Sequence, residues 1–134
     1  MVALKVFVFA MVLLTSTLGI DPTNAKPDTI MTDWRCNGDL YKKGDPFADP
    51  YVLDDMVKET ANSPGYNYYT KSPFSSLVAY GQVTCNRKLL YSDCVTCIMS
   101  ARDHERIFCY MSVGGQVILR DCTMKYEQYS FTDN

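Results

Sequence analysis

Two cysteines separated by two residues are the first candidates for chemistry in this chain. Cys94 and Cys97 form a Cys-x-x-Cys motif just after Ser92, a residue that can cap a helix. A thiol near a helix N-terminus has a lowered pKa, so the motif is compatible with a redox dithiol. Four further cysteines need partners, however, and no βαβ pattern surrounds the motif. We therefore favour a structural role and keep thiol oxidoreductase activity, which requires a free low-pKa thiol at Cys94, as an alternative.

The other reactive side chains form no catalytic motif. His104 is the only histidine, and it lies within the charged stretch 103–106, which we expect to be a solvated connection. A Ser-His-Asp or Cys-His system would have to recruit this residue. Zinc needs a second ligand pair beside Cys-x-x-Cys, and none occurs. The paired carboxylates Asp54 and Asp55 fall on the polar side of a predicted helix, and no glycine-rich phosphate-binding motif is present. We expect no enzymatic activity, no metal and no cofactor.

Length and composition limit the architecture and the partners. The chain has 134 residues, of which 47% are hydrophobic and 21% are charged, with 13 basic and 15 acidic side chains. This length predicts one domain, and this composition predicts a folded one. Because the net charge is −2, no basic surplus exists to attract a phosphate backbone. Nucleic acid is therefore not an expected partner.

Residues 1–25 have the layout of a signal peptide. Lys5 precedes an apolar run from Val6 to Leu14, and small and polar residues follow it. The run is much shorter than the ~20 apolar residues that cross a bilayer, and no second hydrophobic stretch occurs, so no membrane anchor is expected. We expect cleavage after Ala25, secretion to the extracellular space, and a single mature domain at residues 26–134.

All six cysteines lie in the expected mature chain and indicate a disulfide framework. They are Cys36, Cys85, Cys94, Cys97, Cys109 and Cys122. The secretory route is oxidising, and a domain of this size benefits from covalent cross-links, so three disulfides are predicted. The residue pattern alone leaves open all fifteen pairings that six cysteines permit.

Helical and strand patterns occupy separate stretches of the chain. Apolar residues at helical spacing, with start and stop signals at their ends, predict two helices, at 50–61 and from 92 to 101. Alternating, aromatic or β-branched residues predict strands at 34–37, 66–69, 77–85, 107–111, 117–119 and 122–131, with a turn at 114–115. Segregated helices and strands favour an α+β fold with an antiparallel sheet.

The spacing of three cysteines resembles a known family. Cys85-x8-Cys94-x2-Cys97 matches the signature of the plant cysteine-rich secretory, or stress-antifungal, domain typified by the antifungal seed protein ginkbilobin. The similarity extends over nearly the whole expected mature chain. Its other matching features are Cys36-Asn37, Tyr80-Gly81, the thirteen positions from Cys109 to Cys122, and Tyr126-Glu127-Gln128 with Phe131 following.

This resemblance implies a fold and a disulfide pairing. The fold is two helices packed on a five-stranded antiparallel sheet. The implied disulfides are Cys36–Cys109, Cys85–Cys94 and Cys97–Cys122.

The resemblance also implies a mannose-binding site at Asn37, Gln116 and Glu127. These positions correspond to an Asn, an Arg and a Glu that contact the sugar in ginkbilobin. Amide and carboxylate groups suit sugar hydroxyls, which both donate and accept hydrogen bonds. Gln116 replaces a charged, five-donor guanidinium with a shorter neutral amide, so mannose affinity is expected to fall by about an order of magnitude or to be lost.

We therefore expect a secreted, monomeric, non-enzymatic lectin of the apoplast. It would bind mannose or mannan-type glycans of fungal walls and act in antifungal plant defence. The alternative is an apoplastic protein-interaction module of the same fold with a degenerate sugar site, because this fold also occurs in plant receptor ectodomains.

Overall fold

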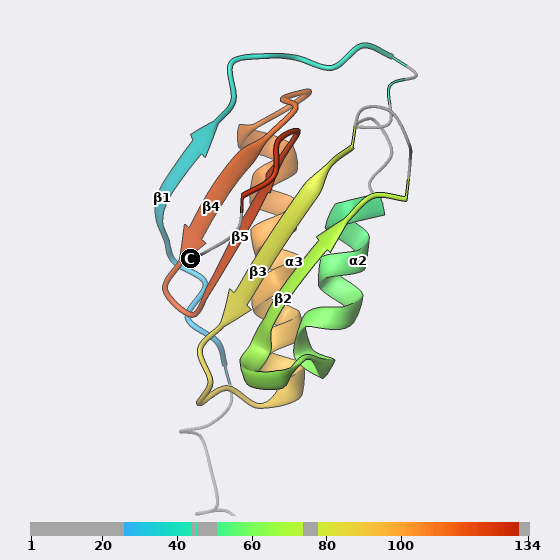
Figure 1. The fold of residues 1–134 in the computed structure, drawn as a ribbon. Coiled ribbons are helices and arrows are strands. Elements are labelled where there is room, and N and C mark those ends of the chain that lie inside the picture. Colours follow the sequence, from blue (N-terminus) through green and yellow to red (C-terminus); the bar gives the residue numbers. More distant parts are fainter. Residues whose placement is uncertain (1–25, 44, 46–50, 74–77, 132–134) are drawn as a thin grey trace, which may run out of the picture.

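A five-stranded antiparallel sheet carries two helices on one of its faces (Figure 1). The computed structural model describes residues 26–43, 45, 51–73 and 78–131. The strand order is β1-β4-β5-β3-β2. The strands are β1 (Met31–Cys36), β2 (Asn67–Lys71), β3 (Tyr80–Cys85), β4 (Gly115–Leu119) and β5 (Cys122–Glu127). The helices are α2 (Tyr51–Glu59) and α3 (Tyr91–Phe108), with short 3-10 segments at Thr60–Asn62 and Pro64–Tyr66. The predicted α+β fold, with two helices on five antiparallel strands, is confirmed.

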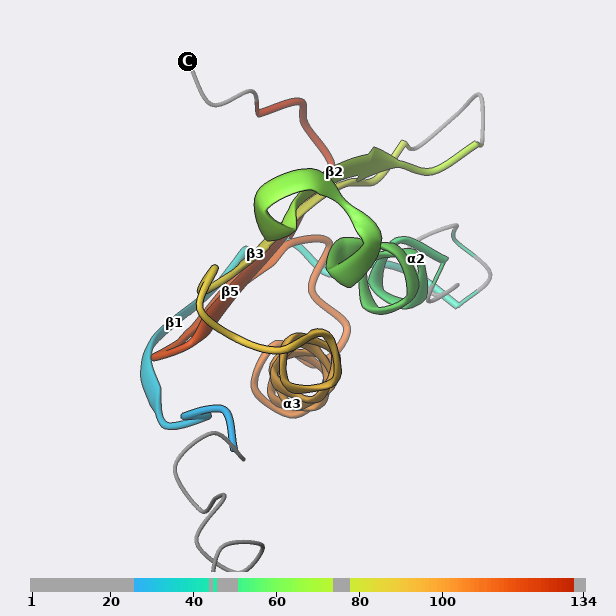
Figure 2. The ribbon, with the colours of Figure 1, turned by 90° about the horizontal axis from the view of Figure 1, so that it is seen from below.

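The two faces of the sheet differ in character. Alternate residues of β3, β4 and β5 are buried, and Val83, Val117 and Met124 have no exposed surface. Both helices lie on this buried side, and the other side, which we call the open face, carries no helix among the described residues (Figure 2). The residues between the buried ones therefore point to the open face, where Gln116 of β4 is paired with Lys125 of β5.

Two helices supply the other half of the core. The buried residues of α3 recur at helical spacing: Cys94, Cys97, Ile98, Ala101 and Glu105. Helix α2 buries Val52 and Met56 against β3. The Asp55 carboxylate of α2 accepts hydrogen bonds from the Tyr68 and Thr70 hydroxyls of β2, at 2.8 and 2.7 Å. Its neighbour Asp54 pairs instead with Arg102 and Arg106 of α3. Asp55 therefore ties α2 to β2, whereas Asp54 remains exposed and forms surface ion pairs with α3.

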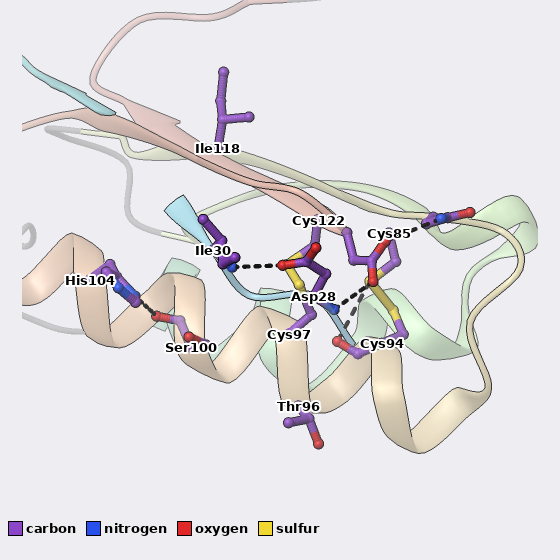
Figure 3. The surroundings of a disulfide bond; sticks show 12 residues. Asp28, Ile30, Cys85, Cys94, Thr96, Cys97, Ser100, His104, Ile118 and Cys122 are labelled. Atoms are coloured by element: carbon purple, nitrogen blue, oxygen red, sulfur yellow. Dashed lines mark hydrogen bonds between the residues drawn. A yellow bond between two sulfur atoms is a disulfide. The ribbon is translucent and has the colours of Figure 1, made fainter. Parts of the chain in front are cut away.

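The three disulfides have the pairing that the family resemblance implied. They are Cys36–Cys109, Cys85–Cys94 and Cys97–Cys122, and no cysteine is free. Figure 3 shows the last two, which join α3 to β3 and β5, with Ile118 of β4 pointing away from the helix. Cys94 and Cys97 are bonded to different elements and not to each other. The free thiol that the oxidoreductase alternative requires is therefore not present.

Several sequence-based boundaries were wrong around the end of α3. The stretch 103–106 was expected to be a solvated connection and 107–111 a strand, but α3 continues to Phe108. The physical reason is that Glu105, four residues after Ala101, continues the buried stripe of the helix. Helix α3 also begins at Tyr91, with Leu90 rather than Ser92 at the cap position. Strand β5 ends at Glu127, and the expected helix start at 49–50 lies outside the described residues.

Replacing Gly81 with alanine tests the packing of α2 on the sheet. A Cβ at this position would lie 2.5 Å from Val52 Cγ1 and 2.8 Å from Met56 Sδ, so the helix must move away from β3. We expect Gly81→Ala to lower the free energy of unfolding in urea by about 1–3 kcal/mol. Gly38→Ala is the matched control, because no atom lies within 4 Å of its Cβ, and it should change stability by less than about 0.5 kcal/mol. Equal stability of the two variants would contradict this packing.

Candidate functional site

Two of the three predicted site residues are in direct contact at one end of the sheet. Asn37 follows β1, and Glu127 is the last residue of β5. The side-chain amide of Asn37 donates from Nδ2 to Glu127 Oε2 at 3.1 Å, although the two residues are 90 positions apart. The Asn37 Oδ1 atom accepts the backbone N–H of Asp39 at 2.9 Å. Both ends of the amide are therefore engaged, and its orientation is fixed.

Gly114 makes this contact possible. It precedes β4, the strand that lies between β1 and β5, and its carbonyl oxygen accepts the backbone N–H of Asn37 at 2.9 Å. A Cβ at Gly114 would collide with the carboxylate of Glu127. The carboxylate thus lies directly against the glycine and reaches the neighbouring strand. Only 7% of Glu127 is exposed, so this acidic group is largely withdrawn from solvent.

Gln116, the third predicted residue, lies on the same face but is not joined to the pair. Its position on β4 is opposite Arg35 of β1 and Lys125 of β5. Within the described residues, its side chain forms no hydrogen bond to Asn37 or Glu127. The structure thus brings Asn37 and Glu127 together and leaves Gln116 as their neighbour, in a row with two basic side chains.

These two basic side chains differ in availability. The Lys125 ammonium lies 4.4 Å from the centroid of the Phe131 ring, which also meets the Tyr69 ring edge-on at 5.8 Å. Lys125 is therefore held in a cation–π contact. The Arg35 side chain is 80% exposed, and within the described part of the chain its one ion pair is with Asp33, at 3.4 Å. Arg35 is consequently the cation beside Gln116 that is more accessible to a ligand.

Tyr129 is a further neighbour of the site. The negative charge of Glu127 raises the pKa of the Tyr129 phenol, with smaller contributions from burial and from a hydrogen bond to the same carboxylate. Tyr129 is 52% exposed, so its ring remains open to a ligand. Tyr129 lies in a bend just after the end of β5 at Glu127, so strand alternation does not place it beside the site.

Behind the site, on the helix side of the sheet, lies a buried acid. Glu105 of α3 is 1% exposed, and neither of its carboxyl oxygens has a hydrogen-bond partner among the described residues. Burial raises the pKa of Glu105 to about 7; the nearby Tyr126 hydroxyl lowers it, and the negative charge of Glu127 raises it. Sequence reasoning missed this residue because its charged neighbours suggested a solvated segment.

The rest of the described structure offers no stronger site. A pocket of about 290 Å³ lies at the other end of the sheet, between 84–86 and 119–123. Its Asp121 carboxylate already accepts hydrogen bonds from the Asp28 backbone and the Asn86 amide. No group of three metal-ligating side chains occurs in the described ranges. Nor does any helix in them have the length and apolar character needed to cross a membrane.

Comparison with known proteins gives relatives over most of the chain. Antifungal protein ginkbilobin-like protein 1 of Picea glauca is 32% identical over 125 residues, covering 90% of this chain and 88% of the relative. Antifungal protein ginkbilobin-2 of Ginkgo biloba is 33% identical over 108 residues, covering 78% of this chain and 80% of that protein. Cysteine-rich receptor-like protein kinase 42 of Arabidopsis thaliana is 30% identical over 99 residues, which are 73% of this chain and 15% of the kinase.

A solved structure has the same fold. The tandem DUF26 ectodomain of the Arabidopsis thaliana cysteine-rich receptor-like protein PDLP8 matches with a TM-score of 0.70 at 24% identity. The match covers 77% of this chain and 50% of the ectodomain, so the present chain spans about half the length of that structure.

The match to a family model covers the site itself. The family described as salt stress response/antifungal matches residues 35–129, a range that contains Asn37, Gln116 and Glu127. Together with the conifer and Ginkgo relatives, this match shows that the chain belongs to the salt stress response/antifungal family, which includes the ginkbilobin-like antifungal proteins.

Proposed function

We propose that this protein is a secreted, non-enzymatic antifungal lectin that binds mannose-containing glycans at Asn37 and Glu127. Family membership supports an antifungal or extracellular role. The observation that supports mannose binding is the Asn37–Glu127 hydrogen bond beside Gly114. This bond joins the only two of the three predicted positions that keep the residue types of the sugar site in ginkbilobin. The proposed ligands are mannose and the mannan-type glycans of fungal walls.

The geometry supports this use in chemical terms. The Glu127 carboxylate accepts from Asn37 at Oε2 and also from the Tyr129 hydroxyl, but its two oxygens have about four lone-pair sites, so acceptor capacity remains for a sugar hydroxyl. The second hydrogen of the Asn37 amide can be donated to a neighbouring hydroxyl. Because the Asx-type bond to Asp39 already fixes this amide, ligand binding costs less conformational entropy than it would at a mobile side chain.

Gln116 supplies a weaker donor than an arginine at the same place, and Arg35 partly compensates for it in this proposal. Residues directly opposite on antiparallel strands have Cβ atoms about 4.5–5.5 Å apart, and Arg35 is the residue opposite Gln116 on β1. The Arg35 side chain therefore starts beside Gln116, and its exposed guanidinium, now paired with Asp33, can turn toward a sugar bound there. The density of repeated sugars on a fungal wall gives this single site a high local concentration of ligand.

Export from the cell is part of the same proposal. Residues 1–25 have signal-peptide character and lie outside the described residues. Three disulfides are typical of proteins that fold in an oxidising compartment. We propose that residues 26–134 are the mature protein of the apoplast.

A protein-interaction module of the same fold is the second candidate. The observation that favours it is an exposed aromatic pair at the sheet edge, Trp34 of β1 and Phe108 of α3, with ring centroids 5.3 Å apart. Two results together would favour this candidate over the lectin. The purified chain would capture a defined apoplastic protein equally well with added mannose and with Asn37→Ala, and it would fail to bind mannose.

Truncating either member of the contact tests the lectin proposal. We expect Glu127→Ala to weaken mannose binding at least tenfold, since a hydrogen bond to a charged group contributes about 1.5–3 kcal/mol, and Asn37→Ala to weaken it about fivefold, since a neutral hydrogen bond contributes about 1 kcal/mol. The measurement is a mannose titration followed by NMR shifts on the purified mature protein. Asn67→Ala is the matched control, because this asparagine lies on the edge strand β2 and bonds to Gln82 rather than to the site. Unchanged mannose affinity in all three variants would refute the proposal.

Restoring the family arginine should strengthen the site. Gln116→Arg replaces a neutral hydrogen bond of about 1 kcal/mol by a charged one of about 1.5–3 kcal/mol. We expect mannose affinity to rise by about tenfold in the same titration. In the double variant with Asn37→Ala the gain should be largely lost, because the arginine then binds without its partners. Unchanged affinity on introducing the arginine would show that position 116 does not contact the sugar.

The glycine beneath the carboxylate offers a third test. Gly114→Ala places a methyl group where Glu127 lies, so the carboxylate must leave Asn37. We expect mannose binding to be lost while the far end of the sheet keeps its NMR spectrum. Gly38→Ala, one residue after Asn37 but with open space around its Cβ, serves as the control and should retain binding. Full binding by Gly114→Ala would mean that the Asn37–Glu127 contact is dispensable.

A further inference from the structure

Glu105 is an unusual group for a protein core. It occupies the buried stripe of α3, where the other members are cysteine, isoleucine and alanine. Both of its carboxyl oxygens are buried without a hydrogen-bond partner in the described part of the chain. Most buried polar side chains are hydrogen-bonded, so an exception of this kind calls for an explanation.

The carboxyl group lies against the backbone that builds the candidate site. A Cβ at Gly115 would collide with Glu105 Oε1 and lie 3.0 Å from Cys109 Sγ. Gly115 follows Gly114, on which the Glu127 carboxylate rests, and Cys109 is disulfide-bonded to Cys36, the residue before Asn37. Glu105 is thus close to both sides of the Asn37–Glu127 contact. Gly115 connects it to Gly114, and the Cys36–Cys109 disulfide connects it to the segment of Asn37.

The neighbouring groups supply no compensating positive charge. Strand β4 presents no ionisable side chain to the helix, since its buried residues are Gly115, Val117 and Leu119. The groups that act on Glu105 or on Tyr126 from other elements are Tyr126 and Glu127 of β5 and Tyr41 of the segment after β1. The basic groups of the same helix turns are engaged elsewhere: Arg102 and Arg106 with Asp54, and His104 with the Ser100 carbonyl.

The hydrogen of Tyr126 is already committed. The Tyr126 hydroxyl donates to the carbonyl oxygen of Ser112 at 2.8 Å. A phenol has a single hydrogen to donate, so its oxygen offers only lone pairs to Glu105. A neutral Glu105 can donate its own proton to that oxygen, whereas an ionised Glu105 must take the hydrogen of Tyr126 away from Ser112.

Ser112 connects the hydrogen bond of Tyr126 to the candidate site. It forms an isolated bridge with Leu40, and the next residue, Val113, donates its N–H to the Asp39 carbonyl oxygen at 3.0 Å. Asp39 is the residue whose backbone N–H fixes the Asn37 amide. Loss of the Tyr126–Ser112 bond therefore loosens the segment that holds Asn37.

We propose that Glu105 is a positioning residue that couples the candidate site to pH. When Glu105 is protonated, the Tyr126 hydroxyl donates to the Ser112 carbonyl oxygen, and the Asn37–Glu127 hydrogen bond is kept. When Glu105 is ionised, the Tyr126 hydroxyl turns to Glu105, and the Asn37–Glu127 hydrogen bond is weakened. The effect on glycan binding rests on the function proposed above, whereas the coupling between Glu105 and the Asn37 segment does not.

The direction of the pH effect follows from the raised pKa. Because the pKa of Glu105 rises from 4.5 to about 7 on folding, the folded chain binds more protons than the unfolded chain between these values. Stability contributed by this group is therefore full below pH 4.5 and falls as the pH rises to about 7. If the ionised form does not bind sugar, apparent mannose affinity at pH 8 is about tenfold lower than at pH 5.

The test is an NMR titration of the full mature protein between pH 4 and 9. In the wild type, the side-chain carboxyl of Glu105 and the side-chain amide of Asn37 should change shift with a common midpoint near pH 7. In Glu105→Gln, which is neutral at every pH, the Asn37 amide should show no such transition, and thermal stability should no longer decline from pH 5 to pH 8. Asp103→Asn is the matched control, since this acid lies on the same helix but is exposed, and it should behave like the wild type.

The outcomes separate this inference from the proposed function. A Glu105 midpoint near pH 4.5, or an Asn37 transition that persists in Glu105→Gln, would overturn the coupling. If Glu105→Gln does not fold, the wild-type titration still decides, because different midpoints for Glu105 and Asn37 also overturn it. A shared midpoint near pH 7 without mannose binding at any pH would support the coupling and defeat the lectin proposal. Mannose affinity with the same pH dependence in wild type and Glu105→Gln would support the lectin and defeat the coupling.

Discussion

Helix α3 is cross-linked to the sheet by all three disulfides, and this constraint organises the molecule. Each disulfide has one cysteine on α3 or at its C-terminal cap and the other on β1, β3 or β5. The cross-links therefore bind one helix to one face of the sheet at several points along its length. Since the covalent connections and both helices lie on that face, the opposite face is free to carry polar side chains.

The candidate site depends on this division between faces. Asn37 follows directly after Cys36, whose disulfide fixes the end of β1, and Glu127 ends a strand that begins with Cys122. The disulfides thus hold the backbone of both polar residues from the helix side, and Gly114 allows their side chains to meet. Glu105 lies on the helix side of the same place, where ionisation is resisted by burial.

The local parts of this architecture could be predicted from the sequence, and the non-local parts could not. The helical spacing of Val52 and Met56 and the alternation of apolar residues around Val83 can be read within short segments. Each spacing indicates the type of element and the side of it that is buried. The Asn37–Glu127 contact joins residues 90 positions apart, so only family resemblance pointed to both residues. Glu105 was missed because a charged residue normally marks the solvated side of a helix, and here it continues the buried one.

The position of β1 in the sequence affects the order in which the sheet and the disulfides can form. Among the described strands, β1 pairs with β4 alone, and the Thr32 hydroxyl donates to the carbonyl oxygen of Ile118, 86 residues later in the chain. Because a chain is synthesised from its N-terminus, β1 emerges long before the strand that pairs with it. Cys36 is synthesised 73 positions before its partner Cys109, whereas Cys85 and Cys94 are only nine positions apart and can join soon after both have been made. The Cys36–Cys109 disulfide can therefore close only after most of the chain has been made.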